Sequence, residues 1–240
     1  MKSKRAQKGL ISFIVISIVL SIAYLLGWSS VLTVKKIEIN GSDSQSRIIS
    51  QLDKNDLVLV NEMKLARVDI RAIKRVISDL DWLASVEVDR NWLKGTINIE
   101  VAEKTAVARA VVDNQKVINF DQNGASFTPA SNKQIRLSLK LPLISSESNS
   151  SQDYAAVAKF LQELPDESNA LITDLIGISV GKSGYISMKT QINNRSVNIN
   201  WGEPTLVSQK SRALQALLLL PENKSAKNFD LSLPDSPVTS

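Results

Sequence analysis

The sequence contains neither cysteine nor histidine among its 240 residues. Without cysteine there can be no disulfide, no thiolate nucleophile and no cysteine-type zinc site. Without histidine the chain lacks the commonest general base near neutral pH and the commonest metal ligand. These absences exclude most catalytic constellations of hydrolases. We therefore expect a protein that is not an enzyme and that needs no metal or cofactor.

The chain also has little excess charge and few aromatic residues, with a net charge of +5 and 5% aromatics. A nucleic-acid-binding face usually spreads basic side chains over a surface and interleaves them with aromatics. Here four basic residues crowd the first eight positions, namely Lys2, Lys4, Arg5 and Lys8. Because this cluster precedes an apolar run, it indicates membrane topology, and we expect no nucleic-acid partner.

The apolar run is LISFIVISIVLSIAYLLGW, residues 10–28, and it holds no charge. About 20 apolar residues in a helix span roughly 30 Å, the hydrocarbon thickness of a bilayer. The positive-inside rule then predicts a cytoplasmic tail at 1–9 and an extracytoplasmic bulk. Tyr24 and Trp28 suit the outer interface. The sequence thus predicts one transmembrane helix, 10–28, in the cell membrane.

A cleaved signal peptide is the alternative interpretation of the same run. Ser21 and Ala23 place small residues at the two key positions of a cleavage site after Ala23. The apolar stretch continues past this point and is longer than the usual core of a signal peptide, which favours a retained anchor. If cleavage did occur, the product would be a secreted binding domain.

Residues 34–104 show the pattern of a small α+β domain. Alternating apolar residues predict a strand at 34–41, and a helix is expected at 42–52. Asp69 can cap a helix at 69–80 that carries one apolar stripe. Two alternating runs joined by a turn at 91–95 predict a hairpin. The order is strand, helix, helix, strand, strand.

Residues 105–238 alternate strands with helices and predict a second, mixed or antiparallel β-domain with flanking helices. The expected helices are 153–164 and 205–220. Strands are expected at 107–112, 116–120, 174–180, 184–190 and 196–201, followed by a last extended segment at 228–238.

Catalytic motifs are weak in this sequence. The one Ser-x-x-Lys pattern, Ser179 to Lys182, lies at the end of an expected strand rather than at a helix start, and its usual partner motifs are missing. The carboxylates are scattered and are expected on solvated faces.

Three stretches resemble the FtsQ/DivIB family of bacterial cell-division proteins. They are VKKIEINGSDS, LARVDIRAIKRVISDLDWLASVEVDRNW and INIEVAEKTAVARAVVDNQKVINFDQNG. The C-terminal region resembles the end of the family's β-domain, with Gly202, Lys210 and Phe229-Asp230-Leu231 at corresponding places. Thr105 stands where the family usually has proline. The resemblance implies a POTRA domain at 34–104 and an FtsQ-type β-domain at 105–238.

The resemblance also implies a function. FtsQ-type proteins are non-enzymatic scaffolds at the division septum that help to control septal wall synthesis. Their partners are FtsB- or DivIC-like and FtsL-like membrane proteins, and the set of partners extends to FtsW- and FtsI-like proteins. A POTRA-type adaptor or chaperone for export or envelope assembly is the alternative. That class usually carries tandem POTRA repeats or a following barrel, and this sequence shows neither.

The C-terminal segment is the best candidate for docking. Leu231 and Leu233 alternate with polar residues, and Pro234 and Pro237 would stop further pairing at a sheet edge. An unpaired edge can accept a strand from another chain. By position, the resemblance makes these the partner-binding residues: Phe229, Asp230, Leu231, Ser232, Leu233, Asp235, Ser236 and Val238. The edge at 34–40 and the face near Arg71 and Lys74 are a second candidate surface.

Overall fold

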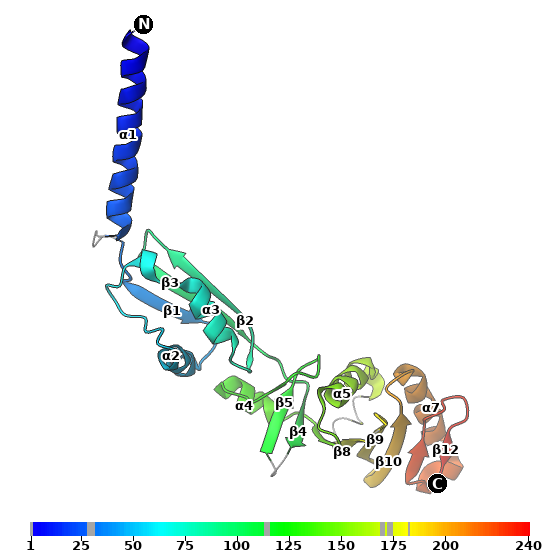
Figure 1. Ribbon diagram of the computed structural model, residues 1–240. Helices are drawn as coiled ribbons and strands as arrows, with labels where there is room; N and C mark the ends of the chain where they lie inside the picture. Colours follow the sequence, from blue (N-terminus) through cyan, green and yellow to red (C-terminus); the bar gives the residue numbers. More distant parts are fainter. Residues whose placement is uncertain (1, 28–31, 113–115, 169–170, 172–174, 182) are drawn as a thin grey trace. The chain divides into compact units, whose positions relative to one another are not determined.

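The protein is described by a computed structural model that covers residues 2–27, 32–112, 116–168, 171, 175–181 and 183–240 (Figure 1). The chain forms two compact units, Met1–Glu103 and Lys104–Ser240. Each unit combines helices with a sheet that contains both parallel and antiparallel pairs. The predicted α+β class is therefore confirmed.

The first helix, α1, spans Lys2–Gly27. Its side chains are described from residue 9 to residue 24. Among the helices of the described residues, none is both long and apolar enough to cross a membrane. The prediction of a transmembrane helix at 10–28 is corrected accordingly. Trp28 and the side chains of Lys2, Lys4, Arg5 and Lys8 lie outside the described part.

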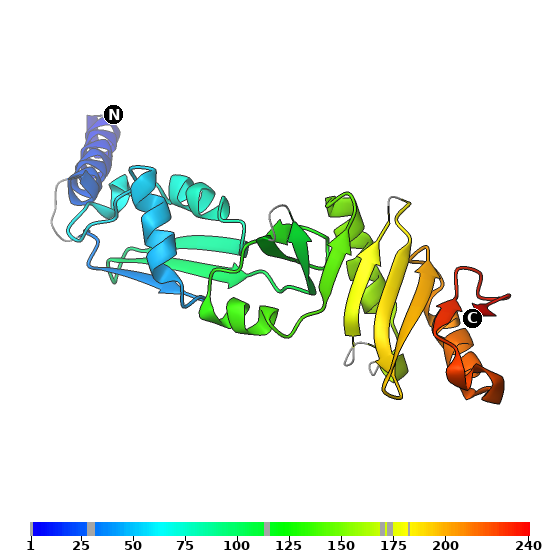
Figure 2. The same ribbon diagram turned by 90° about the horizontal axis from the view of Figure 1, so that it is seen from below.

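The rest of the first unit packs helices on a three-stranded sheet. The strands are β1 (Lys36–Asn40), β2 (Leu83–Asn91) and β3 (Thr96–Glu103). The helices are α2 (Gln45–Lys54), the short η1 (Leu65–Arg67) and α3 (Ile70–Ser78). Strand order is β1-β3-β2, with β1 parallel and β2 antiparallel to β3. In Figure 2, α2 and α3 lie on the same side of this sheet.

Local sequence signals explain these elements. The Asp69 side chain accepts hydrogen bonds from the backbone N–H groups of Arg71 and Ala72, which caps α3 as predicted. Ile73 and Ile77, four residues apart, are buried together on the inner face of that helix. In β2, Val86 and Val88 are buried. The apolar side chains that recur at the helical period in α3 and at every second position in β2 are thus buried in one core.

The second unit is built on a nine-stranded sheet in the order β12-β11-β10-β9-β8-β7-β4-β5-β6. The strands are β4 (Ala108–Val112), β5 (Lys116–Phe120), β6 (Ser126–Phe127), β7 (Leu143–Ser146), β8 (Leu175–Val180), β9 (Ile186–Ile192), β10 (Arg195–Gly202), β11 (Asn228–Asp230) and β12 (Val238–Thr239). The pairs β4–β7, β7–β8 and β10–β11 are parallel, and the others are antiparallel.

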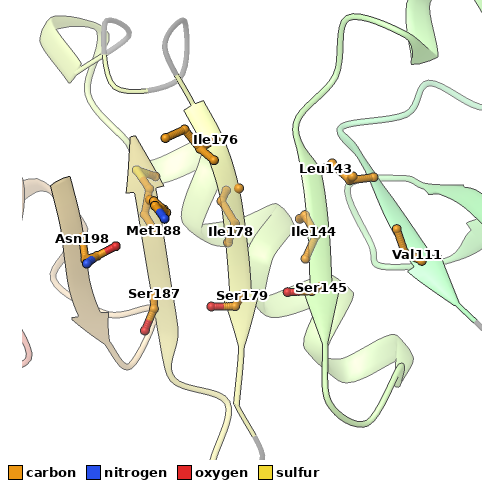
Figure 3. Close-up of a pocket in the computed structure, with 12 residues that line it drawn as sticks. Val111, Leu143, Ile144, Ser145, Ile176, Ile178, Ser179, Ser187, Met188 and Asn198 are labelled. Carbon is orange, nitrogen blue, oxygen red and sulfur yellow. The ribbon is translucent and has the colours of Figure 1, made fainter. Parts of the chain in front are cut away.

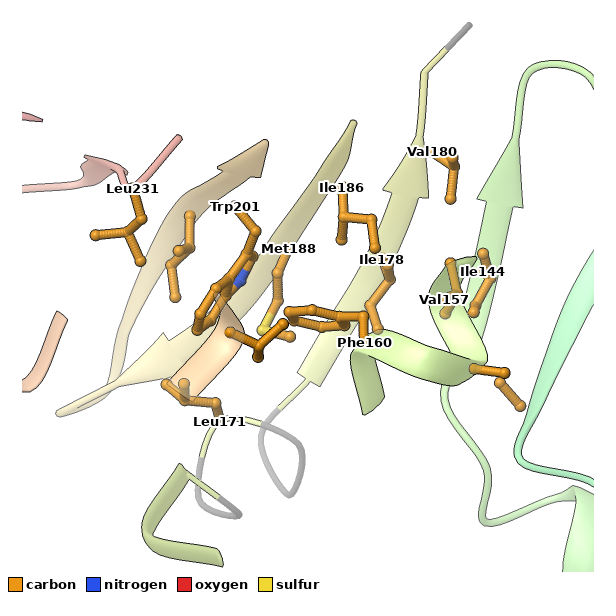
Figure 4. Close-up of a cluster of buried hydrophobic side chains, with 14 of the residues drawn as sticks. Ile144, Val157, Phe160, Leu171, Ile178, Val180, Ile186, Met188, Trp201 and Leu231 are labelled. Carbon is orange, nitrogen blue, oxygen red and sulfur yellow. The ribbon is translucent and has the colours of Figure 1, made fainter. Parts of the chain in front are cut away.

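The described helices of the second unit are α4 (Asn132–Ser138), α5 (Ser151–Glu163), α7 (Val207–Leu219) and the short η3 (Asp166–Ser168) and η4 (Pro221–Ser225). Of these, α5 and α7 contribute buried apolar side chains to the core. Figure 4 shows Phe160 of α5 and Trp201 of β10 among aliphatic side chains of the central strands. Their rings meet edge to face with centroids 5.0 Å apart. This buried cluster fixes β10, the strand on which the C-terminal edge is built.

Candidate functional site

The predicted docking segment does not form one continuous edge strand. β11 lies inside the sheet, parallel to β10 on one side and antiparallel to β12 on the other. The terminal strand β12 is therefore the edge of the nine-stranded sheet (Figure 1). Residues 231–237 form turns between the two strands. The alternation of Leu231 and Leu233 is thus not a strand pattern.

The predicted partner-binding residues separate into two groups. Phe229 and Leu231 are 1% and 0% exposed and belong to the main core cluster, so they cannot present their side chains to a partner. Asp230 and Ser232 are half-buried. The exposed members are Leu233, Asp235, Ser236 and Val238. Whether these residues contact another protein stays a prediction.

The turn after β11 has a local cause. One carboxylate oxygen of Asp230 accepts hydrogen bonds from the backbone N–H of Ser232, at 2.9 Å, and from its hydroxyl, at 2.6 Å. Such a bond two residues along the chain turns the backbone away from an extended path. The chain also passes close to Gly202, where a Cβ would lie 2.8 Å from Cβ of Ser232. A side chain at position 202 would therefore push this turn away from the end of β10.

The backbone of β12 offers a short edge to an incoming strand. Asn228 and Ser240 exchange two backbone hydrogen bonds, of 2.9 and 3.1 Å. In an antiparallel pair these mutually bonded positions alternate with positions whose N–H and C=O point outward. Thr239 is therefore the residue that turns its N–H and C=O away from β11. Pro237, at the next outward position, has no N–H to donate.

Lys210 of α7 stabilises this edge from the buried side of the sheet. Its side chain is 2% exposed, and its Nζ donates to the carbonyl oxygens of Trp201, at 2.6 Å, and Glu203, at 2.8 Å. Burial lowers the pKa of this lysine, and the charges of Glu203 and Asp230 act in the opposite direction. The lysine thus ties α7 to the last turn of β10. The resemblance stated from the sequence includes this lysine, whereas its buried position is known only from the structure.

Asp230 is the charged group at the centre of the edge. Hydrogen bonds from the side chain and backbone of Ser232 lower its pKa, and Asn200 and the charge of Lys210 act in the same direction. Asn200 donates to the second carboxylate oxygen at 3.1 Å. Because both oxygens are held by neighbouring strands and turns, this carboxylate organises the fold of the edge.

Polar side chains also join β10, β11 and β12 along the outer end of the sheet. The Asn198 amide donates to the side-chain oxygen of Asn228 at 3.0 Å, and the Thr239 hydroxyl donates to that of Asn223 at 3.0 Å. Gln209 of α7 donates to Asp235 at 3.0 Å. These contacts hold the strands and the preceding helix together without using the outward backbone groups of β12.

A second feature, which sequence reasoning missed, is a hollow of about 480 Å³ on the sheet surface (Figure 3). Its lining includes the exposed apolar residues Leu143 and Ile176 and the small residues Gly177, Ser145 and Ser179. Among the described residues that line the hollow, Lys189 is the one charged side chain. The sequence signal for this hollow was the small residues that point outward from three strands, β7, β8 and β9. They could not be combined without knowing that β7, β8 and β9 are neighbours.

The other predicted surface lies on the first unit. β1 is an edge strand of the three-stranded sheet, and β2 is the opposite edge. Arg71 and Lys74 are exposed on α3. Of the Ser179–Lys182 pattern, Ser179 is exposed in β8, and Lys182 lies outside the described residues. Within the described part, no group of three acidic residues gathers where it could hold a metal ion.

Comparison with known proteins adds no relative to this picture. No protein-family model matches the chain, and no curated protein matches it significantly in sequence.

Proposed function

We propose that this chain is a non-enzymatic scaffold of the bacterial division machinery, of the FtsQ/DivIB type, which docks partner proteins at the septum. The partners would be FtsB- or DivIC-like and FtsL-like proteins. This proposal combines the sequence resemblance with the C-terminal edge, and it does not require α1 to cross a membrane.

The observation that carries the proposal is the edge strand β12, which hydrogen bonds hold in place. Its outer backbone groups at Thr239 point away from β11, while the strand itself is fixed through β11 to β10 and α7. A fixed edge gives a partner strand a template without the entropy cost of ordering it first. Main-chain hydrogen bonds would supply affinity, and the exposed Val238 and Leu233 would supply side-chain contacts.

Co-purification with the FtsB- or DivIC-like and FtsL-like proteins of the same bacterium tests the proposal. The affinity of the complex would be measured for the wild-type chain and for Thr239→Pro. The proline removes the outward N–H that a partner strand would bind, and we expect affinity to fall roughly tenfold or more.

The matched control is Thr239→Val, which keeps the N–H and removes only the hydroxyl that contacts Asn223. It should bind nearly as the wild type does. If no complex forms, the proposed function is contradicted. If the proline variant binds as tightly as the wild type, docking does not use this edge.

A further inference from the structure

The tip of the β2–β3 hairpin in the first unit carries two exposed apolar side chains. Leu93 is 97% exposed, the most of any large apolar side chain in the described part of the chain. Its neighbour Trp92 is 37% exposed. A leucine that makes almost no contact within its own fold contributes little to folding, so this position is available to contact something else.

The tip is nevertheless a rigid turn. The side-chain oxygen of Asn91 accepts from the backbone N–H of Lys94 at 3.0 Å, and its carbonyl oxygen accepts from Gly95 at 2.9 Å. Gly95 has a φ of +71°, and a Cβ there would lie 2.7 Å from the carbonyl oxygen of Thr33. The carbonyl of Gly95 also accepts from Lys35 at 2.7 Å. The hairpin therefore presents its apolar residues in a fixed place.

The indole of Trp92 is held by a cation. The guanidinium of Arg90 lies 4.9 Å from the centre of the ring and donates to the carbonyl oxygen of Val68 at 2.7 Å. Arg90 thus anchors the tryptophan to the loop before α3 and places positive charge beside it.

Basic side chains surround the tip. Lys94 is exposed in the turn itself, and Lys35 lies against Gly95. Lys64 and the exposed Arg67 come from the segment that pairs with residue 33.

Acidic residues offset this charge only in part. Glu38 is held in an ion pair with Lys36, with nitrogen and oxygen 2.6 Å apart. Glu62 lies on the connecting segment, where its backbone N–H donates to Val34, and Asp89 is exposed on β2 three residues before Trp92. The end of the unit that carries Trp92 and Leu93 is therefore positive.

We propose that this hairpin tip docks on an anionic lipid surface. Tryptophan favours the headgroup level of a bilayer, a neighbouring leucine can enter the acyl boundary, and lysine and arginine are attracted to anionic headgroups. An apolar tip surrounded by basic side chains therefore matches a bilayer surface, in which anionic headgroups lie outside the apolar acyl chains. The contact is peripheral, and it uses the first unit rather than the C-terminal edge of the second. The proposal is therefore independent of the proposed function.

A single introduced thiol can test the proposal, because the full chain has no cysteine. Leu93→Cys would be labelled with the polarity-sensitive fluorophore NBD and mixed with vesicles of phosphatidylcholine and phosphatidylglycerol. We expect a blue shift and quenching by lipids spin-labelled near the headgroup. The matched control is Ser46→Cys on α2, an exposed position beyond the opposite end of β1. It should show neither change.

Charge is tested in the same labelled chain. Lys94→Glu should weaken vesicle binding by roughly fivefold or more, while Arg47→Glu at an exposed position of α2 should leave it nearly unchanged. Vesicles of phosphatidylcholine alone should give little response. An unshifted label at position 93, an equal shift at position 46, or equal effects of the two charge reversals would overturn the proposal.

Discussion

At the scale of single residues, the C-terminal edge depends on groups that are buried but fully engaged. Lys210 is a cation inside a mainly apolar core, and desolvation there disfavours its charge. Its two carbonyl acceptors are at the end of β10, where the strand gives way to the turn at Gly202. A buried donor with satisfied acceptors specifies one arrangement of helix and strand, because any other arrangement would leave polar groups unpaired.

Asp230 gives a prediction about pH. Its pKa in the folded protein lies below the ordinary value of 3.8, so the folded state favours the charged form. The resulting stabilisation is present above about pH 4 and is lost as the pH falls through the lowered pKa. Asp230→Asn should therefore reduce the free energy of unfolding of the second unit by about 1–2 kcal/mol at pH 7. As the pH falls through this lowered pKa, the difference from the wild type should shrink.

Urea unfolding at a series of pH values measures this effect. Asp235→Asn is the matched control, because that exposed carboxylate accepts one hydrogen bond from a side chain. It should change stability little at any pH. A loss for Asp230→Asn that stayed constant down to the acid limit would show that charge is not what stabilises the turn.

At the scale of elements, the cap of α3 supports another prediction. The Asp69 carboxylate accepts from two of the helix's first backbone N–H groups, each at 3.0 Å. Asp69→Ala would leave both donors to water, and should cost about 1 kcal/mol of unfolding free energy in the first unit. Asp79→Ala, at the other end of the same helix, removes no such cap. If the two variants lost equal stability, the cap would not be the cause.

Elements of this kind could be predicted because their signals are local. Asp69, the stripe through Ile73 and Ile77, and the alternation in β2 lie within a few residues of the structure they determine. The end of the chain is different. Leu233 alternates with Leu231, yet it follows the Asp230 turn and is 68% exposed, whereas Leu231 is buried. The hydrogen-bonded turn from Asp230 to Ser232 ends the strand, although the alternation of apolar residues predicted that it would continue.

At the scale of the whole molecule, the strand order of the long sheet could not be predicted from the sequence. Its strand order places β7 between β8 and β4, and the parallel pair β10–β11 spans the whole of α7. Such pairings depend on contacts between distant segments, for which a single sequence carries no periodic signal. For the same reason the hollow across β7, β8 and β9 could not be predicted.

The two units should unfold separately, because each has its own core. Gly41 has a φ of +94°, and a Cβ there would lie 1.8 Å from the carbonyl oxygen of Val101. Gly41→Ala should destabilise the first unit by about 2 kcal/mol or more, since the strand end would have to move. Lys210→Met should destabilise the second unit by about 2–4 kcal/mol, because it leaves two carbonyl groups without their donor.

Hydrogen exchange measured by mass spectrometry separates the two effects, since peptides can be assigned to either unit. Gly41→Ala should accelerate exchange in residues 34–103 and leave 104–240 unchanged, and Lys210→Met should do the reverse. Lys189→Met, at an exposed lysine of β9, is the control and should alter neither. Equal acceleration in both units from either variant would mean that the chain unfolds as one cooperative body, and the division into two independent cores would be wrong.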